Sequence, residues 1–120
     1  MTSFSVTVRE LSTGPLLEFA GELDVHTAAE VRAALHEISL AAGQQLVADL
    51  SGLTFCDSSG ISTFIAARNR ALSVDAGIAL AAVPERIART FRLIGLSDLF
   101  PTYPSVHEAA AAWDGRATGS

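Results

Sequence analysis

Two short stretches of the sequence are apolar with almost no polar alternation: QLVADLSGL at residues 45–53 and IALAAV at residues 78–83. A strand has this composition when both faces of its sheet are covered, which is typical of parallel strands flanked by helices. A longer segment with helical spacing, from about Ser59 to Gly77, lies between them. We therefore expect a parallel β-α-β unit and a fold of the α/β class.

An antiparallel hairpin is expected before this unit. Phe4–Glu10 and Leu16–Gly21 are rich in β-branched or large apolar residues. The turn-forming residues STGP separate them. The hairpin adds two strands to the sheet.

The segment after the hairpin predicts the first helix, with one apolar face formed by Val31, Leu35, Ile38 and Ala42. Thr27 and Glu30 have the spacing of a capping box, in which each side chain accepts a hydrogen bond from the other residue's amide. Gly43 is expected to end this helix.

Three further helices are indicated. The second carries an apolar stripe formed by Ile61, Phe64, Ile65 and Leu72. Pro84 opens the third and Gly95 ends it. Its inward residues are Ile87, Phe91 and Ile94, and its solvated face carries Arg86, Arg89 and Arg92. A short strand near PTY precedes the last helix, which has a capping box at Ser105 and Glu108 and carries Val106, Ala110 and Trp113.

The order of these elements predicts a single-domain α/β fold with a mixed β-sheet of four to five strands and about four α-helices. We assign residues 1–114 to this domain and expect residues 115–120 to form a flexible tail. Right-handed crossovers would place the parallel strands side by side and gather their strand-to-helix loops at one end. Function usually lies in such loops.

Charge and cysteine content narrow the function. A net charge of −5 and a pI near 5.0 argue against direct DNA binding and against an anionic membrane surface. Cys56 is the only cysteine, so no internal disulfide is possible, and it is either a small partly buried apolar residue or a reactive thiol. We expect a cytoplasmic protein with no export signal, membrane span, metal site or cofactor.

Two loops should converge at the functional end: GELDVHT at residues 21–27 and LTFCDSSG at residues 53–60. Asp57, Ser58 and Ser59 are three capping-type residues in a row, whereas one helix start needs only one. Gly60 just inside the helix costs roughly 1 kcal/mol against alanine, which indicates close approach by another backbone or by a partner.

Two enzymatic or phosphotransfer alternatives use the same residues. Ser58 could be a nucleophile with His26 as base and Asp24 as orienting acid, although the G-x-S-x-G elbow is absent. Asp49 or Asp57 could accept a phosphoryl group as in receiver domains. Such domains need an acidic pair after the first strand to hold magnesium, and none is present.

Three segments carry a family resemblance: GELDVHTAAEVRAAL, VADLSGLTFCDSSGIS and RTFRLIGLSDLFPTYPSVHEAA. Together they resemble the STAS domain family, in particular its bacterial anti-sigma factor antagonists. The resemblance implies a binding protein rather than an enzyme. The unphosphorylated form would bind an anti-sigma factor, a serine kinase with a GHKL-type ATP site, and release a sigma factor.

The resemblance also implies the site. Ser58, the first serine of D-S-S-G, would be phosphorylated by the kinase and restored by a PP2C-type phosphatase. The implied partner-binding residues are Asp24, His26, Thr27, Cys56, Asp57, Ser58, Ser59, Gly60 and Ile61. The protein would be a monomer or weak dimer. The alternative within the family is a STAS scaffold or transporter-associated subunit that is never phosphorylated.

Overall fold

A computed structural model describes residues 3–116 of the chain. The strands are β1 (Ser5–Leu11), β2 (Gly14–Leu23), β3 (Gln45–Cys56), β4 (Gly77–Ala81) and β5 (Thr102–Tyr103). The helices are α1 (Ala28–Glu37), α2 (Ser58–Ser73), α3 (Glu85–Leu93), the 3-10 helix η1 (Ser97–Leu99) and α4 (Val106–Ala112).

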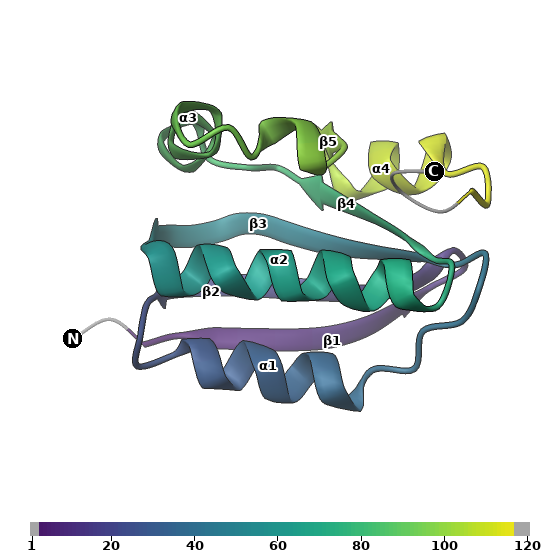
Figure 1. Cartoon of the computed structure of the whole chain (residues 1–120), viewed down its shortest axis with the longest axis horizontal. Coiled ribbons are helices and arrows are strands. Elements are labelled where there is room, and N and C mark those ends of the chain that lie inside the picture. The colour runs from purple at the N-terminus through teal and green to yellow at the C-terminus, as the bar shows by residue number, and fades with distance from the viewer. Residues whose placement is uncertain (1–2, 117–120) are drawn as a thin grey trace.

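The strands form one mixed sheet in chain order, β1-β2-β3-β4-β5, as Figure 1 shows. β1 runs antiparallel to β2, and each later pair is parallel. The predicted hairpin, the parallel unit and the short strand at PTY are therefore confirmed. Five strands and four α-helices within residues 3–116 match the predicted fold class.

Alternation along β3 divides the core between the two faces of the sheet. Leu46, Ala48 and Leu50 belong to the main cluster, which also contains residues of α1, α2 and α3. Val47, between them, belongs to a smaller cluster that includes Ala109 of α4. The β3 segment thus reads as uniformly apolar because helices cover both of its faces.

A row of five aromatic rings crosses the main core from the N-terminal edge of the sheet to the segment before β5. The centroid distances of successive pairs are 6.4 Å for Phe4 and Phe19, 5.3 Å for Phe19 and Phe64, 5.9 Å for Phe64 and Phe91, and 5.9 Å for Phe91 and Phe100. Phe64 of α2 stands in the middle and is 1% exposed. It connects the sheet to α3.

The first helix is shorter than predicted. It ends at Glu37, and Ile38 already has extended backbone, so the predictions that Gly43 ends the helix and that Ala42 lies on its buried face are wrong. Ile38 is nevertheless buried, because the extended chain after the helix also covers the core. The Thr27 hydroxyl makes no cap hydrogen bond, so the predicted capping box with Glu30 does not form.

The later helices follow their predicted starts more closely than their ends. α2 stops at Ser73, and Asp75, with a φ of 58°, turns the chain into β4, so Gly77 begins a strand rather than ending a helix. Ile94 is 51% exposed instead of facing inward.

Three of the predicted helix boundaries are confirmed. Pro84 precedes α3, and Gly95 follows it with a φ of +77°. Ser105 accepts from the Glu108 amide at 3.1 Å. Trp113, placed on α4 by the sequence, is the residue that follows it, and its indole N–H donates to the Gly43 carbonyl. The tail predicted at residues 115–120 lies outside the described residues from position 117 onward.

Candidate functional site

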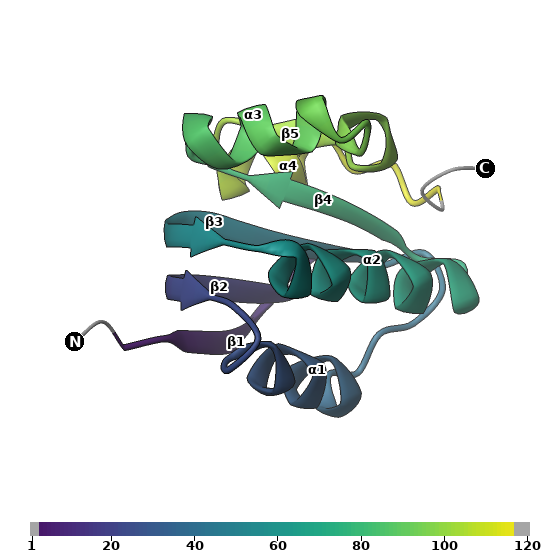
Figure 2. The same cartoon turned by 60° about the vertical axis from the view of Figure 1, so that its left-hand side comes forward.

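The two loops predicted to converge do meet at the carboxyl end of the parallel strands. Leu23, the last residue of β2, pairs with Cys56, the last residue of β3. The Asp57 amide then donates to the Leu23 carbonyl at 3.2 Å. Figure 2 shows that α1 and α2 begin beside the two strand tips. The loop at residues 24–27 and the start of α2 therefore form one continuous surface.

Asp57 is the residue that caps α2. Its backbone is extended, and its carboxylate accepts from the Gly60 amide at 3.1 Å. Only this one residue separates β3 from α2. Because the cap is taken by Asp57, neither serine after it is needed for that role.

Ser58, the first residue of α2, is exposed, and its hydroxyl makes no hydrogen bond within residues 3–116. Ser59 is half-buried, and its hydroxyl likewise makes none there. The Asp57 carboxylate, and not the Ser59 hydroxyl, supplies the side-chain acceptor for the first turn of α2. Of the two hydroxyls, that of Ser58 is the more accessible.

Replacing Asp57 by alanine is expected to lower the free energy of unfolding by about 1 kcal/mol, because the Gly60 amide loses its acceptor. Asp57→Asn retains a side-chain oxygen that can accept this hydrogen bond, so its free energy of unfolding should fall by only about a few tenths of a kcal/mol. Ser58→Ala should change the free energy of unfolding by no more than about 0.5 kcal/mol, since the Ser58 hydroxyl makes no hydrogen bond within the described part of the chain. Urea unfolding of the three variants checks this. A larger loss in Ser58→Ala than in Asp57→Ala would contradict the assignment of the cap.

Gly60 lies where α2 crosses the end of β2. A Cβ at this position would stand 2.7 Å from the Cys56 Sγ, 2.8 Å from the Leu23 Cγ and 3.0 Å from the Leu23 carbonyl oxygen. The predicted close approach at Gly60 is thus confirmed, and the neighbour is this chain itself. Gly60 and Ile61 are both buried, so they support the exposed serine from beneath.

The loop at residues 24–27 is held by its own side chains. The Asp24 carboxylate accepts from the amides of His26 and Thr27 and from the Thr27 hydroxyl, at 2.9, 3.2 and 3.3 Å. The Thr27 hydroxyl also lies 2.9 Å from the Glu22 carbonyl and accepts from the Asp24 amide. These bonds fix the loop and leave the Val25 side chain 66% exposed beside the site.

Cys56 is a partly buried free cysteine of the candidate site. Burial, with a further contribution from the neighbouring Asp57 carboxylate, raises the pKa of the Cys56 thiol from 9.0 to about 12. The Sγ is 3.6 Å from the Asp57 carbonyl oxygen. The thiol is therefore neutral at physiological pH, and the structure favours the small apolar reading over the reactive one.

Alkylation of Cys56 by iodoacetamide at pH 8 is expected to be very slow in the folded protein. A pKa of about 12 instead of 9.0 lowers the thiolate fraction about a thousandfold. The raised pKa also favours folding below pH 9, and this stability is lost as the pH rises toward 12. Intact-mass measurement with and without urea separates the two states, and equal rates in both would contradict a protected thiol.

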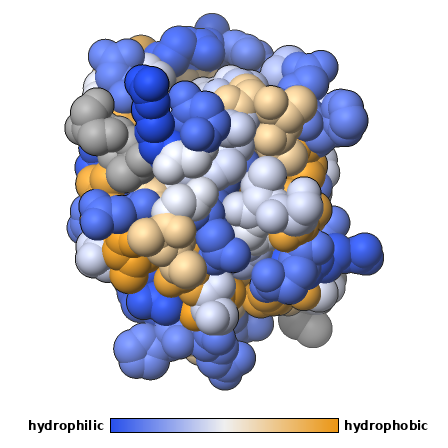
Figure 3. Space-filling model, turned by 90° about the vertical axis from the view of Figure 1, so that its right-hand side faces the viewer, coloured by the Kyte–Doolittle hydropathy of each residue, from blue (hydrophilic) through white to orange (hydrophobic). Residues whose placement is uncertain are grey.

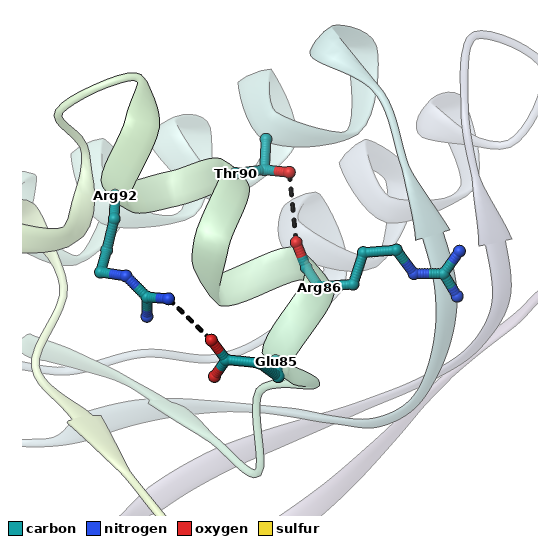
Figure 4. Close-up of polar contacts among 4 residues, drawn as sticks. All are labelled: Glu85, Arg86, Thr90 and Arg92. Atoms are coloured by element: carbon teal, nitrogen blue, oxygen red, sulfur yellow. Dashed lines mark hydrogen bonds and ion pairs between the residues drawn. The ribbon is translucent and has the colours of Figure 1, made fainter.

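An exposed aromatic residue near the site was not anticipated from the sequence. Phe55, at the end of β3, is 45% exposed although it is large and apolar. It lines a groove of about 170 Å³ with Cys56, Arg86 and Thr90. Figure 4 shows the Arg86 side chain extending from α3 away from the Arg92–Glu85 ion pair, and its guanidinium lies 3.5 Å from the Thr54 carbonyl. All three α3 arginines are exposed, as predicted.

The sequence pattern around Phe55 gave little indication that its side chain is exposed. Phe55 follows Thr54 in a segment that reads as strand, and alternation alone does not tell which face lacks a covering helix. The groove joins residues more than 30 positions apart, which no local pattern reveals.

The site offers little support for the two alternative chemistries. The His26 side chain is exposed, and no hydrogen bond within residues 3–116 links its ring to Ser58. Asp49 accepts from the Ser51 amide and Asp57 caps α2, so both carboxylates have structural partners. Among the described residues, no three His, Cys, Asp or Glu side chains cluster in a way that could hold a metal ion.

Figure 3 shows the end of the molecule opposite to this surface, where most of the visible residues are polar and hydrophobic residues lie between them. Within the described part of the chain, no helix is long and apolar enough to cross a membrane.

Sequence comparisons find a family model and curated relatives that match most of this chain. The family model of the STAS domain matches residues 5–109. The anti-sigma-B factor antagonist of Listeria monocytogenes is 31% identical over 98 residues, covering 81% of this chain and 86% of that protein. The anti-sigma-B factor antagonist of Staphylococcus epidermidis is 29% identical over 83 residues, covering 69% and 77%.

Solved structures share the fold. An anti-sigma factor antagonist from Mycobacterium paratuberculosis has a TM-score of 0.74 at 24% identity, covering 92% of this chain and 94% of that one. The anti-sigma factor antagonist SpoIIAA in its unphosphorylated form has a TM-score of 0.72 at 19% identity, covering 88% and 92%. The phosphorylated form of Bacillus SpoIIAA has a TM-score of 0.63 at 18% identity, covering 89% and 97%.

Proposed function

Since this chain belongs to the STAS domain family, we propose that it is an anti-sigma factor antagonist switched by phosphorylation of Ser58. In this proposal the unphosphorylated protein binds an anti-sigma factor in the cytoplasm and so releases a sigma factor for transcription. The anti-sigma factor is a serine kinase with a GHKL-type ATP site. It phosphorylates Ser58, and a PP2C-type phosphatase reverses the modification.

One observation carries the proposal: Ser58 presents an exposed hydroxyl that makes no hydrogen bond with any of the described residues, because Asp57 already caps the helix. A hydroxyl with no structural partner can be modified without breaking the fold. The names of the sequence relatives support the partner class, since they are anti-sigma-B factor antagonists of similar length.

The position of Ser58 also suits a reversible charge. A phosphate adds about −1.5 to −2 charges at the start of α2, where the helix dipole and the first amides favour an anion. The domain therefore stays folded when modified. The effect is felt by a partner that must cover the site, where the Asp57 carboxylate is already present.

The partner surface in this proposal combines the two loops. Asp24, His26 and Thr27 come from the first, and Cys56, Asp57, Ser58 and Ser59 come from the second, with Gly60 and Ile61 beneath them. The exposed residues Val25, in the first loop, and Phe55, near the end of β3, add apolar area to this surface. Aromatic and aliphatic groups within a polar surround are typical of a binding interface.

Incubation with a cognate anti-sigma factor kinase and ATP tests the switch. The wild-type protein and Ser59→Ala are expected to gain the mass of one phosphate, whereas Ser58→Ala gains none. Ser59→Ala is the matched control because it removes a neighbouring hydroxyl from the same helix turn. A phosphate mapped to Ser59, or no gain in the wild type, would overturn the phosphorylation switch.

Partner binding without phosphorylation would favour the alternative function within the STAS family. If the wild type binds its partner but is modified by no cognate kinase, the protein is a constitutive STAS scaffold or a transporter-associated subunit. A fluorophosphonate probe that acylates Ser58 would instead support a hydrolase.

A further inference from the structure

A cavity of about 280 Å³ lies away from the Ser58 surface, between α3, η1 and strands β4 and β5. Leu80 and Val83 line it from the β4 side, and Phe91 and Phe100 line it from the opposite side. The buried residues among them belong to the main core, so the walls are held in place. At about 30 Å³ per water molecule, the space equals about nine waters and suits a ligand of about ten non-hydrogen atoms.

Arg92 is the one charged residue among the described residues that line this cavity. Ser97 and Thr102 are its other polar lining residues, and the Thr102 hydroxyl donates to the Phe100 carbonyl at 3.1 Å. No acidic residue is among the described residues that line it. An apolar wall with a single cation and nearby hydroxyls is complementary to an anionic group on an apolar body.

The cation is available to a ligand. Arg92 contacts Glu85 at 2.7 Å, and the two side chains are 53% and 81% exposed. Figure 4 shows the pair on α3. Exposed ion pairs of this kind contribute little to stability, so Glu85 can give up its place at small cost. The contact also shows that the guanidinium, in this position, already holds a carboxylate.

We propose that this cavity binds a small monocarboxylate with an apolar body, whose carboxylate takes the place of Glu85 on Arg92. The apolar part lies against Leu80, Phe91 and Phe100. The bound acid bridges α3 to the β4–β5 end of the sheet.

The probe is 3-phenylpropanoate, and its neutral counterpart is 3-phenylpropan-1-ol. Titration followed by backbone amide shifts of the full chain should give a dissociation constant on the order of 0.1 mM for the acid. The alcohol should bind at least tenfold more weakly. The largest shifts are expected in α3, η1 and β5.

Four variants test the geometry after each is shown to have a wild-type melting temperature. Ala88→Leu fills the cavity from α3 and should abolish binding of both probes. Arg92→Gln should weaken binding of the acid about tenfold, to the affinity of the alcohol. Glu85→Gln should strengthen binding of the acid about threefold, because it removes the carboxylate that competes for Arg92. Arg89→Gln is the matched control, since this exposed arginine does not line the cavity.

The pattern across the two probes decides the outcome. Tighter acid binding in Glu85→Gln with unchanged alcohol binding would support the proposal. Equal affinity for acid and alcohol, an Arg92→Gln variant that binds the acid like the wild type, shifts confined to other elements, or no binding of either probe would overturn it.

Discussion

Phosphorylation of Ser58 is expected to weaken binding of the anti-sigma factor about thirtyfold, and Ser58→Asp about fivefold. The cause is the Asp57 carboxylate, which is fixed beside Ser58 as the helix cap. When a partner covers the site, the effective dielectric constant around both charges falls to ~20. At ~6 Å their repulsion then rises by roughly 4 kcal/mol for a dianion and roughly 2 kcal/mol for a monoanion, and salt screening removes about half.

Calorimetric titration of the four protein forms checks this order of affinities. Ser58→Ala is the control and should bind within about twofold of the wild type, because it removes a hydroxyl without adding charge. Higher salt should narrow the gap between Ser58→Asp and Ser58→Ala. The melting temperature of Ser58→Asp should be no lower than that of the wild type, since an anion is favourable at a helix start. Equal binding of the Asp and Ala variants would refute the electrostatic mechanism.

Replacing Phe64 by alanine is expected to lower the free energy of unfolding by about 3–5 kcal/mol, a large part of the stability of a domain of this size. Phe64 is 1% exposed and stands between Phe19 and Phe91 in the row of rings, so its removal leaves a cavity with aromatic walls. Each ring pair adds about 0.5–1.5 kcal/mol beyond the apolar area that it buries.

Two substitutions serve as controls in a urea unfolding series. Phe64→Leu keeps most of the side-chain volume, so its free energy of unfolding should fall much less than that of Phe64→Ala. Phe55→Ala removes the same side chain from a site that is 45% exposed, and should lose under about 1 kcal/mol. Equal losses for Phe64→Ala and Phe55→Ala would contradict the central place of Phe64 in the core.

The elements of the fold were predictable wherever a local pattern decides the outcome. The hairpin follows from two apolar runs around STGP, and β3 and β4 follow from their uniform apolar composition. The start of α2 was predicted within one residue, because Asp57, Ser58 and Ser59 all favour a helix start. The meeting of the two loops followed from strand topology alone.

The errors arose where distant contacts override local pattern. Ile38 continues the apolar periodicity of α1, but its backbone is extended. Its carbonyl accepts a hydrogen bond from the Arg70 guanidinium at 3.0 Å, a contact between residues 32 positions apart. Thr27 and Glu30 have the spacing of a capping box, but the Thr27 hydroxyl is hydrogen-bonded to the Glu22 carbonyl and the Asp24 amide instead. The groove beside Phe55 and the role of Asp24 in its own loop likewise depend on tertiary geometry.

The single residue between β3 and α2 constrains how any enzyme could reach Ser58. With Asp57 bonded on one side to the Leu23 carbonyl and on the other to the Gly60 amide, the serine cannot be drawn out as an extended peptide. A kinase that modifies Ser58 has to recognise the folded domain. The specificity of the kinase therefore depends on contacts with the folded surface and not on a linear sequence motif. Short peptides around D-S-S-G would be poor substrates, and new kinase pairings would evolve by changes spread over both loops.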